Sequence, residues 1–227
     1  MLDRKKIILV GTSHVSTESV QKIDAAIAEH KPQIICLELD KQRFEGLLHG
    51  HRTKFSFKLI RQIGIIGTLF VLIGSNVQNH IAKKIGTTPG IDMLHGFKKG
   101  RELGIKVALI DQPASITLKK LSKQFKKREI WYMVVDTVKS LFGKPPLPIK
   151  QFSVEKIPSQ KTIDTILVYM HNRYPSLYSV LVAQRNIYMV QRLEILSFEF
   201  DTIVAVVGAA HKTGMEHLLN EKRNNHN

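Results

Sequence analysis

Residues 7–14 of this chain read Ile-Ile-Leu-Val-Gly-Thr-Ser-His. The first four are apolar and mostly β-branched, which is typical of a short buried strand, and Gly11 ends the run. A helical pattern with an apolar residue every three or four positions follows, and Pro32 closes it. We therefore predict that the fold begins with a strand and an amphipathic helix.

Three further apolar runs repeat the strand pattern. They cover residues 34–37, 106–110 and 203–207, and residues 93–103 have the pattern of a helix. Strands that alternate with helices form parallel βαβ connections, and strands without polar alternation are covered on both faces. The sequence predicts an α/β fold with a central, mostly parallel sheet flanked by helices.

Positive charge is concentrated in the middle of the chain. The 227 residues include 34 Lys and Arg against 19 Asp and Glu, a net charge of +15. Residues 51–160 hold 20 basic and 6 acidic residues, whereas residues 1–50 hold seven of each. We predict a single domain over residues 1–227, in which residues 51–160 form a basic, mainly helical insertion or lid.

Composition excludes several classes of protein. With 43% hydrophobic residues, the chain is neither disordered nor a polytopic membrane protein, and its single cysteine excludes a disulfide framework. The apolar run at 63–73 is short, so a core helix or lid is favoured over a segment that dips into a membrane. The basic stretch 119–128 has no aromatic platform or recognition helix beside it, so we predict no specific nucleic-acid partner. An anionic membrane surface fits this charge better.

Polar residues follow every predicted strand. Glu38 follows the second strand and Asp111 the third, while the pattern Gly-x-x-His follows the first (Gly11 to His14) and the fourth (Gly208 to His211). The carboxyl ends of parallel strands share one edge of a sheet, and glycine lets a ligand approach the backbone closely. We expect these residues to form one site.

Two imidazoles and a carboxylate are a suitable donor set for a divalent metal. A histidine near the start of a helix tends to be neutral, which is its metal-binding form. His14, Glu38 and His211 would make an open site for Mn, Co or Zn that activates water for hydrolysis of an amide or ester. The competing interpretation is that both histidines only cap loops by hydrogen bonding.

Two charged residues near this site have alternative interpretations. Arg43 is a candidate either to pair with the buried Glu38 or to hold a substrate carboxylate or carbonyl. Asp111 is either a ligand or, as we favour, the cap of a helix near Ser115.

A long helix is predicted from Pro175 to Leu196. Gln184 and Tyr188 share one of its faces, and Arg185 lies on the next. This face is either solvated or forms a polar rim of the site.

In this order, the motifs resemble the TraB/PrgY family, whose relatives include the Tiki metalloproteases and, more remotely, erythromycin esterase and ChaN-like proteins. The resemblance extends from Ile7 to about Leu219 and rests mainly on the paired Gly-x-x-His motifs and the Glu-x-Asp-x-x-Arg run. It is carried by residues 10–16, 37–43, 89–92, 109–111, 183–189 and 207–215.

The resemblance implies a metal-dependent hydrolase-like domain. His14, Glu38 and His211 match the family's metal positions, and Arg43 and Arg185 match its arginines. With Glu38, these arginines are the candidate catalytic residues.

The implied substrate is a short hydrophobic peptide. TraB and PrgY shut down the self-produced peptide pheromone of conjugative plasmids, so we expect the same role here. The candidate substrate-binding residues are Gly11, Gly208, Gln184 and Tyr188.

Three positions depart from the resemblance. The family commonly has Glu at the positions of Gln184 and Asp92, and Arg at that of Gln112. A non-catalytic module that sequesters the peptide is therefore the alternative function. Because family members often continue into C-terminal membrane helices, we expect a membrane-associated protein. The sequence leaves open its membrane side and whether it forms oligomers.

Overall fold

The computed structural model describes residues 5–12, 17–49, 90–141 and 159–224. Within this part of the chain, four parallel strands form one sheet in the order β1-β4-β2-β3. The prediction of an α/β fold with a parallel sheet is confirmed. The strands are β1 (Lys6–Thr12), β2 (Ile34–Leu37), β3 (Lys106–Leu109) and β4 (Thr202–Gly208).

The last strand in the sequence lies between the first two. β4 pairs with β1 along its whole length, from Lys6 opposite Thr202 to Thr12 opposite Gly208, and its other edge pairs with β2. The β1 and β2 strands, which a βαβ connection would often place side by side, are therefore separated by β4. This order brings the carboxyl ends of β1, β4 and β2 next to one another.

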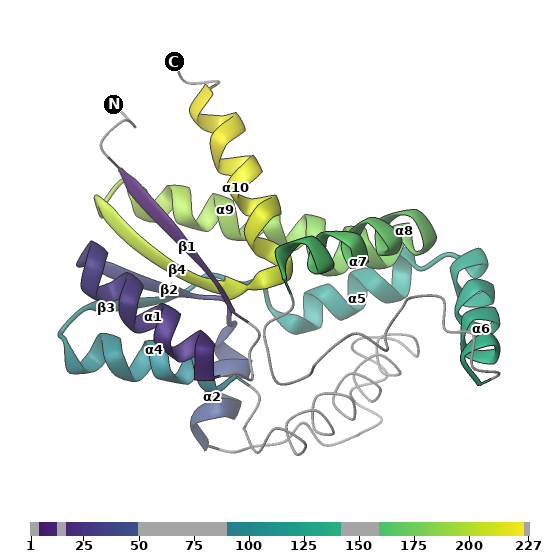
Figure 1. The fold of residues 1–227 in the computed structure, drawn as a ribbon, viewed down its shortest axis with the longest axis horizontal. Helices are drawn as coiled ribbons and strands as arrows, with labels where there is room; N and C mark the ends of the chain where they lie inside the picture. Colours follow the sequence, from purple (N-terminus) through teal and green to yellow (C-terminus); the bar gives the residue numbers. More distant parts are fainter. Residues whose placement is uncertain (1–4, 13–16, 50–89, 142–158, 225–227) are drawn as a thin grey trace.

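Alternate residues of β4 face opposite layers of helices. Ile203, Ala205 and Val207 belong to one core cluster, and Val204 and Val206 to the other, as expected for a strand covered on both faces. Each fully buried valine or isoleucine among them contributes about 1.5–3 kcal/mol to folding. The first cluster includes residues of α9 (Gln184–Ser197) and α10 (Ala209–Asn224), and the second includes residues of α1 (Thr17–His30) and α4 (Ile91–Glu102) (Figure 1).

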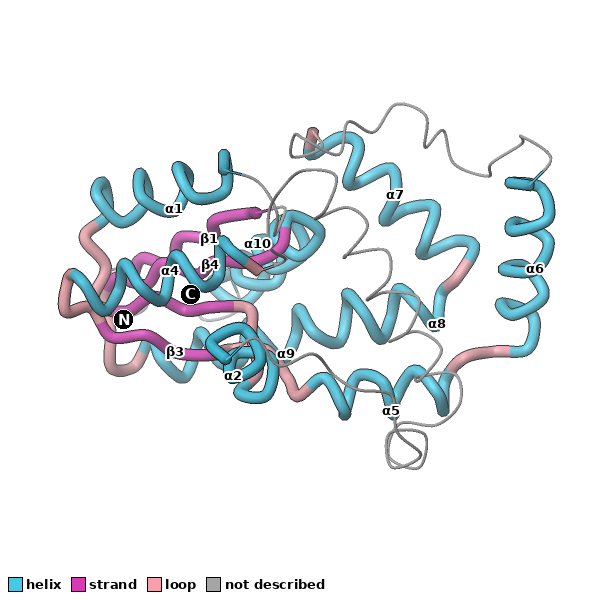
Figure 2. The backbone as a smooth tube through the Cα atoms, turned by 90° about the horizontal axis from the view of Figure 1, so that it is seen from below, coloured by secondary structure: helices cyan, strands magenta, loops and turns pink. Residues whose placement is uncertain are grey.

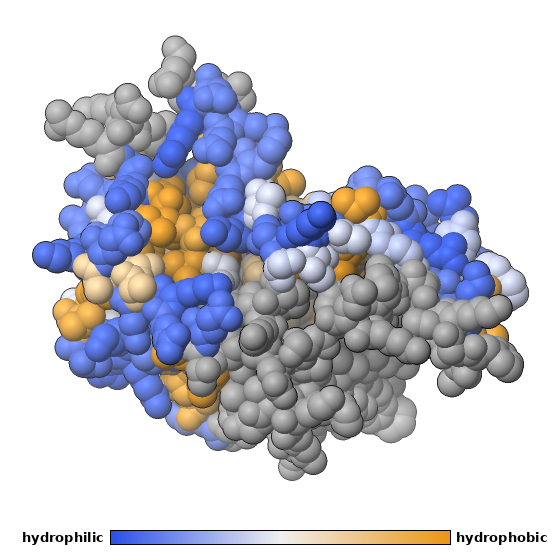
Figure 3. All heavy atoms as spheres, viewed as in Figure 1, coloured by the Kyte–Doolittle hydropathy of each residue, from blue (hydrophilic) through white to orange (hydrophobic). Residues whose placement is uncertain are grey.

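Strand β1 lies at the edge of the sheet. Figure 3 shows hydrophobic residues there, between the hydrophilic outer surfaces of α10 and α1.

The single cysteine of the chain lies in β2. Burial of Cys36 raises the pKa of its thiol to about 12, although Arg192 opposes the shift. This cysteine is therefore a core residue and not a thiolate nucleophile at neutral pH.

The remaining helices extend the molecule beyond the carboxyl edge of the sheet, except for α2 (Lys41–His49), which follows β2 (Figures 1 and 2). The extension, called the helical arm below, consists of α5 (Ala114–Gln124), α6 (Lys127–Leu141), α7 (Gln160–Arg173) and α8 (Pro175–Tyr178). A π-helical turn, η2 (Ser179–Ala183), joins α8 directly to α9, in agreement with the long helix predicted there.

The region 51–160 is not simply an insertion. It supplies α4 and β3 to the core as well as α5 and α6 to the helical arm. The apolar run at 63–73 and the proline-rich segment at 143–148 lie outside the described residues. None of the described helices is long and apolar enough to cross a membrane.

Candidate functional site

Four candidate site residues lie at or just after the ends of strands whose carboxyl ends share one edge of the sheet. Glu38 comes directly after β2, and its backbone N–H donates to Val206 O, which continues the pairing with β4 by one residue. Gly208 ends β4, and His211 lies in the first turn of α10. Asp111 follows β3 and donates its N–H to Leu39 O. His14, the other predicted imidazole ligand, lies outside the described residues.

Glu38 is buried and accepts hydrogen bonds through both carboxylate oxygens. Oε2 accepts the N–H of Gly208 at 2.6 Å, and Oε1 accepts Nη2 of Arg185. Oε1 also lies 3.2 Å from Nε2 of His211. Burial of a carboxylate is costly unless it is paired, and these contacts satisfy that requirement. Of the two arginines, Arg185 is therefore the one that pairs with Glu38.

Arg185 joins three elements at the site. It binds Asp111 in a bidentate geometry, with Nε 3.1 Å from Oδ1 and Nη2 2.6 Å from Oδ2. Its Nη1 donates to Leu181 O in the π-helical turn and lies 3.0 Å from Nε2 of His211. Burial opposes the charged guanidinium, but Glu38 and Asp111 outweigh that effect and hold the pKa of Arg185 above its ordinary value. The guanidinium is thus a fixed positive charge in the site.

Arg43 pairs with Asp40 and Asp111, and not with Glu38 as one of its two interpretations proposed. Its Nε donates to Asp40 Oδ2 at 2.7 Å, and its Nη2 donates to Asp111 Oδ2. Burial tends to raise the pKa of Asp40, but hydrogen bonds from the backbone and side chain of Arg43 and from Ala114 N–H bring it below its ordinary value. The Arg43 side chain remains 38% exposed, so its outer part faces solvent.

The favoured role of Asp111 as a helix cap is wrong. Asp40, and not Asp111, accepts the N–H of Ala114 at the start of α5. Asp111 accepts instead from Gln112 N–H and from both arginines, and its side chain is fully buried. Asp111, two residues after the end of β3, is therefore the point where Arg43 and Arg185 meet.

Two residues that sequence reasoning did not assign to the site hold His211 in place. Oδ1 of Asn186 lies 2.6 Å from Nδ1 of His211, and both side chains are buried. A Cβ atom at Gly214 would lie 2.4 Å from Nδ2 of Asn186. Gly214 follows His211 by about one helical turn, so its lack of a side chain leaves room for Asn186 beside the histidine. This spacing is the sequence signal that could have indicated both residues.

The predicted substrate-binding residues lie around this cluster but do not form one wall of it. Gly11 is half-buried in β1 beside the Lys212 side chain, and Tyr188 is half-buried on α9. The amide nitrogen of Gln184 donates to Gln124 of α5 and to Ser179 of η2. Gln184 therefore ties α9 to the helical arm.

The described residues supply two of the three predicted metal donors. Glu38 Oε1 and His211 Nε2 are chemically suited to Mn²⁺, Co²⁺ or Zn²⁺. The Asn186 oxygen on Nδ1 provides the kind of oxygen acceptor that orients a metal-bound imidazole. No group of three or more His, Cys, Asp or Glu residues is arranged for a metal within 5–12, 17–49, 90–141 and 159–224. Arg185 contacts both donor atoms, so a metal ion there would compete with its guanidinium.

The fold and the site together define an α/β protein in which two arginines meet buried carboxylates and a buried imidazole at the carboxyl edge of a parallel sheet. The chain belongs to the TraB/PrgY/gumN family, whose model matches residues 2–226. It is 29% identical over 219 residues to an uncharacterised protein of Methanocaldococcus jannaschii, covering 96% of this chain and 54% of that relative. It is 24% identical to the TraB domain-containing protein of Bos taurus and 23% identical to that of Homo sapiens, covering 94% of this chain and 62% of each relative. The chain thus spans between about half and three-fifths of the length of these relatives.

Proposed function

We propose that this domain captures a short hydrophobic peptide at the carboxyl edge of the sheet and hydrolyses it with the help of a divalent metal ion. The observation that carries the proposal is the buried convergence of Glu38, His211 and Arg185, because a carboxylate, an imidazole nitrogen and a fixed cation are the groups that amide hydrolysis uses. Mn²⁺, Co²⁺ or Zn²⁺ would be held by Glu38 and His211 together with His14, and when bound would supply an activated water.

The chain's own residues have separate proposed roles. Glu38 is held by the Gly208 N–H, so one carboxylate oxygen stays directed toward His211. Arg185 supplies positive charge for the developing oxyanion. Arg43 is anchored by two carboxylates and half-exposed, so its outer N–H donors suit the carboxylate of a peptide.

The proposed substrate class is a short hydrophobic peptide. A conjugation pheromone is the first peptide to test, because TraB and PrgY act on such peptides. Gly11, Gly208, Gln184 and Tyr188 are the proposed contacts for its backbone and apolar side chains. They lie on three different elements around the cluster.

A specific observation favours the alternative, a module that binds the peptide without cleaving it. Arg185 already contacts both Glu38 Oε1 and His211 Nε2, the atoms that a metal would need. Gln184, moreover, is an amide and cannot act as a base or an anionic ligand. Stoichiometric binding without turnover is the result that this alternative requires.

The decisive experiment combines metal analysis with peptide turnover. The purified protein is analysed for bound metal, then incubated with a hydrophobic peptide and Mn²⁺, Co²⁺ or Zn²⁺, with and without a chelator, and products are measured by mass spectrometry. Turnover that the chelator removes and Glu38→Gln abolishes supports the hydrolase. The matched control is His217→Ala, because His217 lies on the same helix as His211 but is exposed. Peptide that stays intact with every metal excludes the hydrolase.

A further inference from the structure

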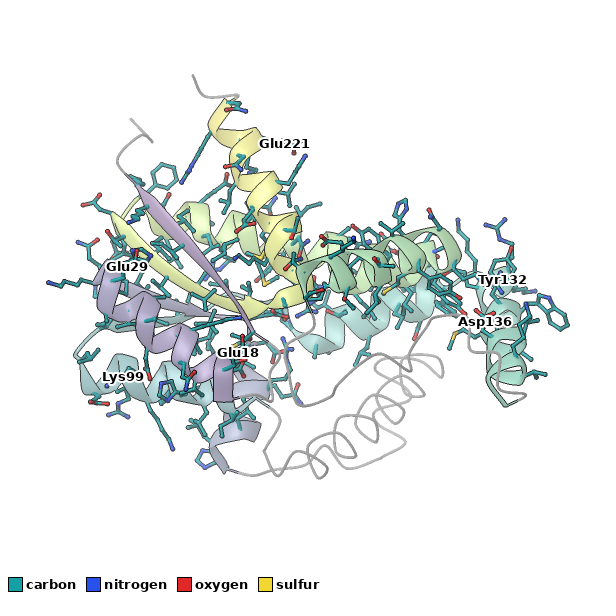
Figure 4. The ribbon with its side chains drawn as sticks, in the orientation of Figure 1. Glu18, Glu29, Lys99, Tyr132, Asp136 and Glu221 are labelled. Atoms are coloured by element: carbon teal, nitrogen blue, oxygen red, sulfur yellow. The ribbon has the colours of Figure 1, made fainter. Side chains whose placement is uncertain are left out.

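Helix α6 packs against the protein with polar residues and turns apolar residues outward. Glu129 and Asp136 are buried and Tyr132 is half-buried on the packed side, a spacing that places all three on one face. Figure 4 shows α6 at the far end of the helical arm, with Tyr132 and Asp136 on the side that faces the other arm helices. This is the reverse of the usual amphipathic helix, which buries its apolar face.

Charge-assisted hydrogen bonds fix α6 in this orientation. Asp136 accepts two bonds from Arg173, at 2.8 and 3.1 Å, and one each from the hydroxyls of Tyr169 and Tyr174. The Arg173 guanidinium also lies 4.0 Å from the centre of the Tyr132 ring. The outward direction of the apolar face therefore follows from a specific anchor.

A second anchor lies about two helical turns earlier. Both carboxylate oxygens of Glu129 accept the N–H of Ser176, at 3.1 and 3.2 Å, at the start of α8. Negative charge is favourable at a helix N-terminus, and Glu129 is almost fully buried there. The two anchors together prevent α6 from rotating to bury its apolar residues.

The outward face of α6 is a continuous apolar stripe. Positions 130, 134 and 138 lie one above another at four-residue spacing, and Trp131 lies beside them. A run of large apolar side chains at this exposure is typical of an interaction surface. The exposed fractions are 41% for Ile130, 65% for Trp131, 49% for Val134 and 45% for Val138.

The surroundings of the stripe are positively charged. The two acidic residues within α5, α6 and their connection, Glu129 and Asp136, are both buried. The seven basic residues of the same stretch are exposed or half-buried, so the available charge on this part of the arm is positive. They are Lys119, Lys120, Lys123, Lys126, Lys127, Arg128 and Lys139.

We propose that the outer face of α6 docks the domain on an anionic lipid bilayer. An apolar stripe with an exposed tryptophan and a basic flank matches the interface of such a bilayer, where aliphatic groups enter the acyl boundary and lysines contact the headgroups. A second copy of the chain is a poorer occupant, because two α6 faces would bring like charges together. The proposal is independent of peptide hydrolysis.

The test uses the fluorescence of Trp131, which is the single tryptophan of the chain. The protein is titrated with phosphatidylcholine vesicles and with vesicles that contain about one-third phosphatidylserine. Only the anionic vesicles are expected to shift Trp131 emission to the blue and to sediment the protein, and salt is expected to weaken both effects.

Two variants separate the apolar and electrostatic contributions. The double variant Val134→Ser and Val138→Ser, and separately the pair Lys126→Glu and Lys127→Glu, are each expected to weaken vesicle binding about tenfold or more. The matched control is Val168→Ser, because Val168 is an exposed valine on α7, away from the stripe. Circular dichroism checks that each variant is folded.

Three outcomes would overturn the proposal. One is Trp131 emission that stays unchanged with anionic vesicles. Another is vesicle binding that both α6 variants retain in full, which would assign binding to a different surface. The third is a blue shift without lipid that grows with protein concentration together with molecular mass, which would assign the stripe to a second copy.

Discussion

Oδ1 of Asn186 lies 2.6 Å from Nδ1 of His211 in a buried part of the site. An amide oxygen only accepts hydrogen bonds, so Nδ1 of His211 donates in this contact. Nε2 is left to face Glu38 and Arg185, 3.2 Å from Glu38 Oε1 and 3.0 Å from Arg185 Nη1. One contact from α9 thus decides which nitrogen of His211 is available for chemistry.

Replacing Asn186 by Leu should remove the contact that keeps a proton on Nδ1 of His211. The apolar side chain has a similar size but no acceptor, so the buried Nδ1–H loses its partner, at a cost of about 1–3 kcal/mol in the free energy of unfolding. Nitrogen chemical shifts of the imidazole, measured by NMR, should change from one tautomer to a mixture. Asn186→Asp keeps an acceptor and should keep the proton on Nδ1. An unchanged tautomer in Asn186→Leu would show that other contacts set it.

Replacing Gly214 by Ala should destabilise the protein, although the same change in most helices stabilises it. A glycine-to-alanine change within a helix ordinarily gains about 0.5–1 kcal/mol. Here the new Cβ would lie 2.4 Å from Nδ2 of Asn186, and overpacking of this kind costs about 1–3 kcal/mol. Urea unfolding measures the sign. Glu216→Ala, at an exposed position of the same helix, is the control and should leave stability nearly unchanged.

The sequence predicted the strands and the composition of the site more fully than it predicted the pairings. Uninterrupted apolar runs identify buried strands wherever they lie, and the parallel arrangement then places Glu38 and Asp111 at one edge. The position of β4 between β1 and β2 was not predictable, because the order of strands depends on contacts between distant segments.

The ion pairs depended on the same long-range packing. Arg43 is near Glu38 in sequence, and this proximity favoured a pairing between them. The structure instead brings Arg185 to Glu38 from 147 positions away. A sequence identifies a buried carboxylate that needs a partner, but the packing of helices selects the guanidinium that reaches it.

Replacing Arg185 by Met should cost about 3–5 kcal/mol near neutral pH, because Glu38 and Asp111 would lose a shared positive partner in a buried site. Urea unfolding at about pH 7.5 measures the loss. Arg192→Met, an exposed position of α9, is the control. A loss no larger than that of the control would contradict the buried pairing.

Replacing Asp136 by Asn should weaken the anchor of α6 in a way that depends on pH. Hydrogen bonds from Arg173 lower the pKa of Asp136 from 3.8 to about 2, although burial opposes the shift. A depressed folded-state pKa adds stability that is present above the unfolded-state pKa and is lost as the pH falls through the folded-state value. The variant should therefore be less stable than the natural protein by about 2 kcal/mol at pH 6. The difference should decrease between about pH 4 and pH 2. Unfolding curves of both proteins over this range measure it, and a difference that does not vary with pH would show that the Asp136 charge is not what holds α6.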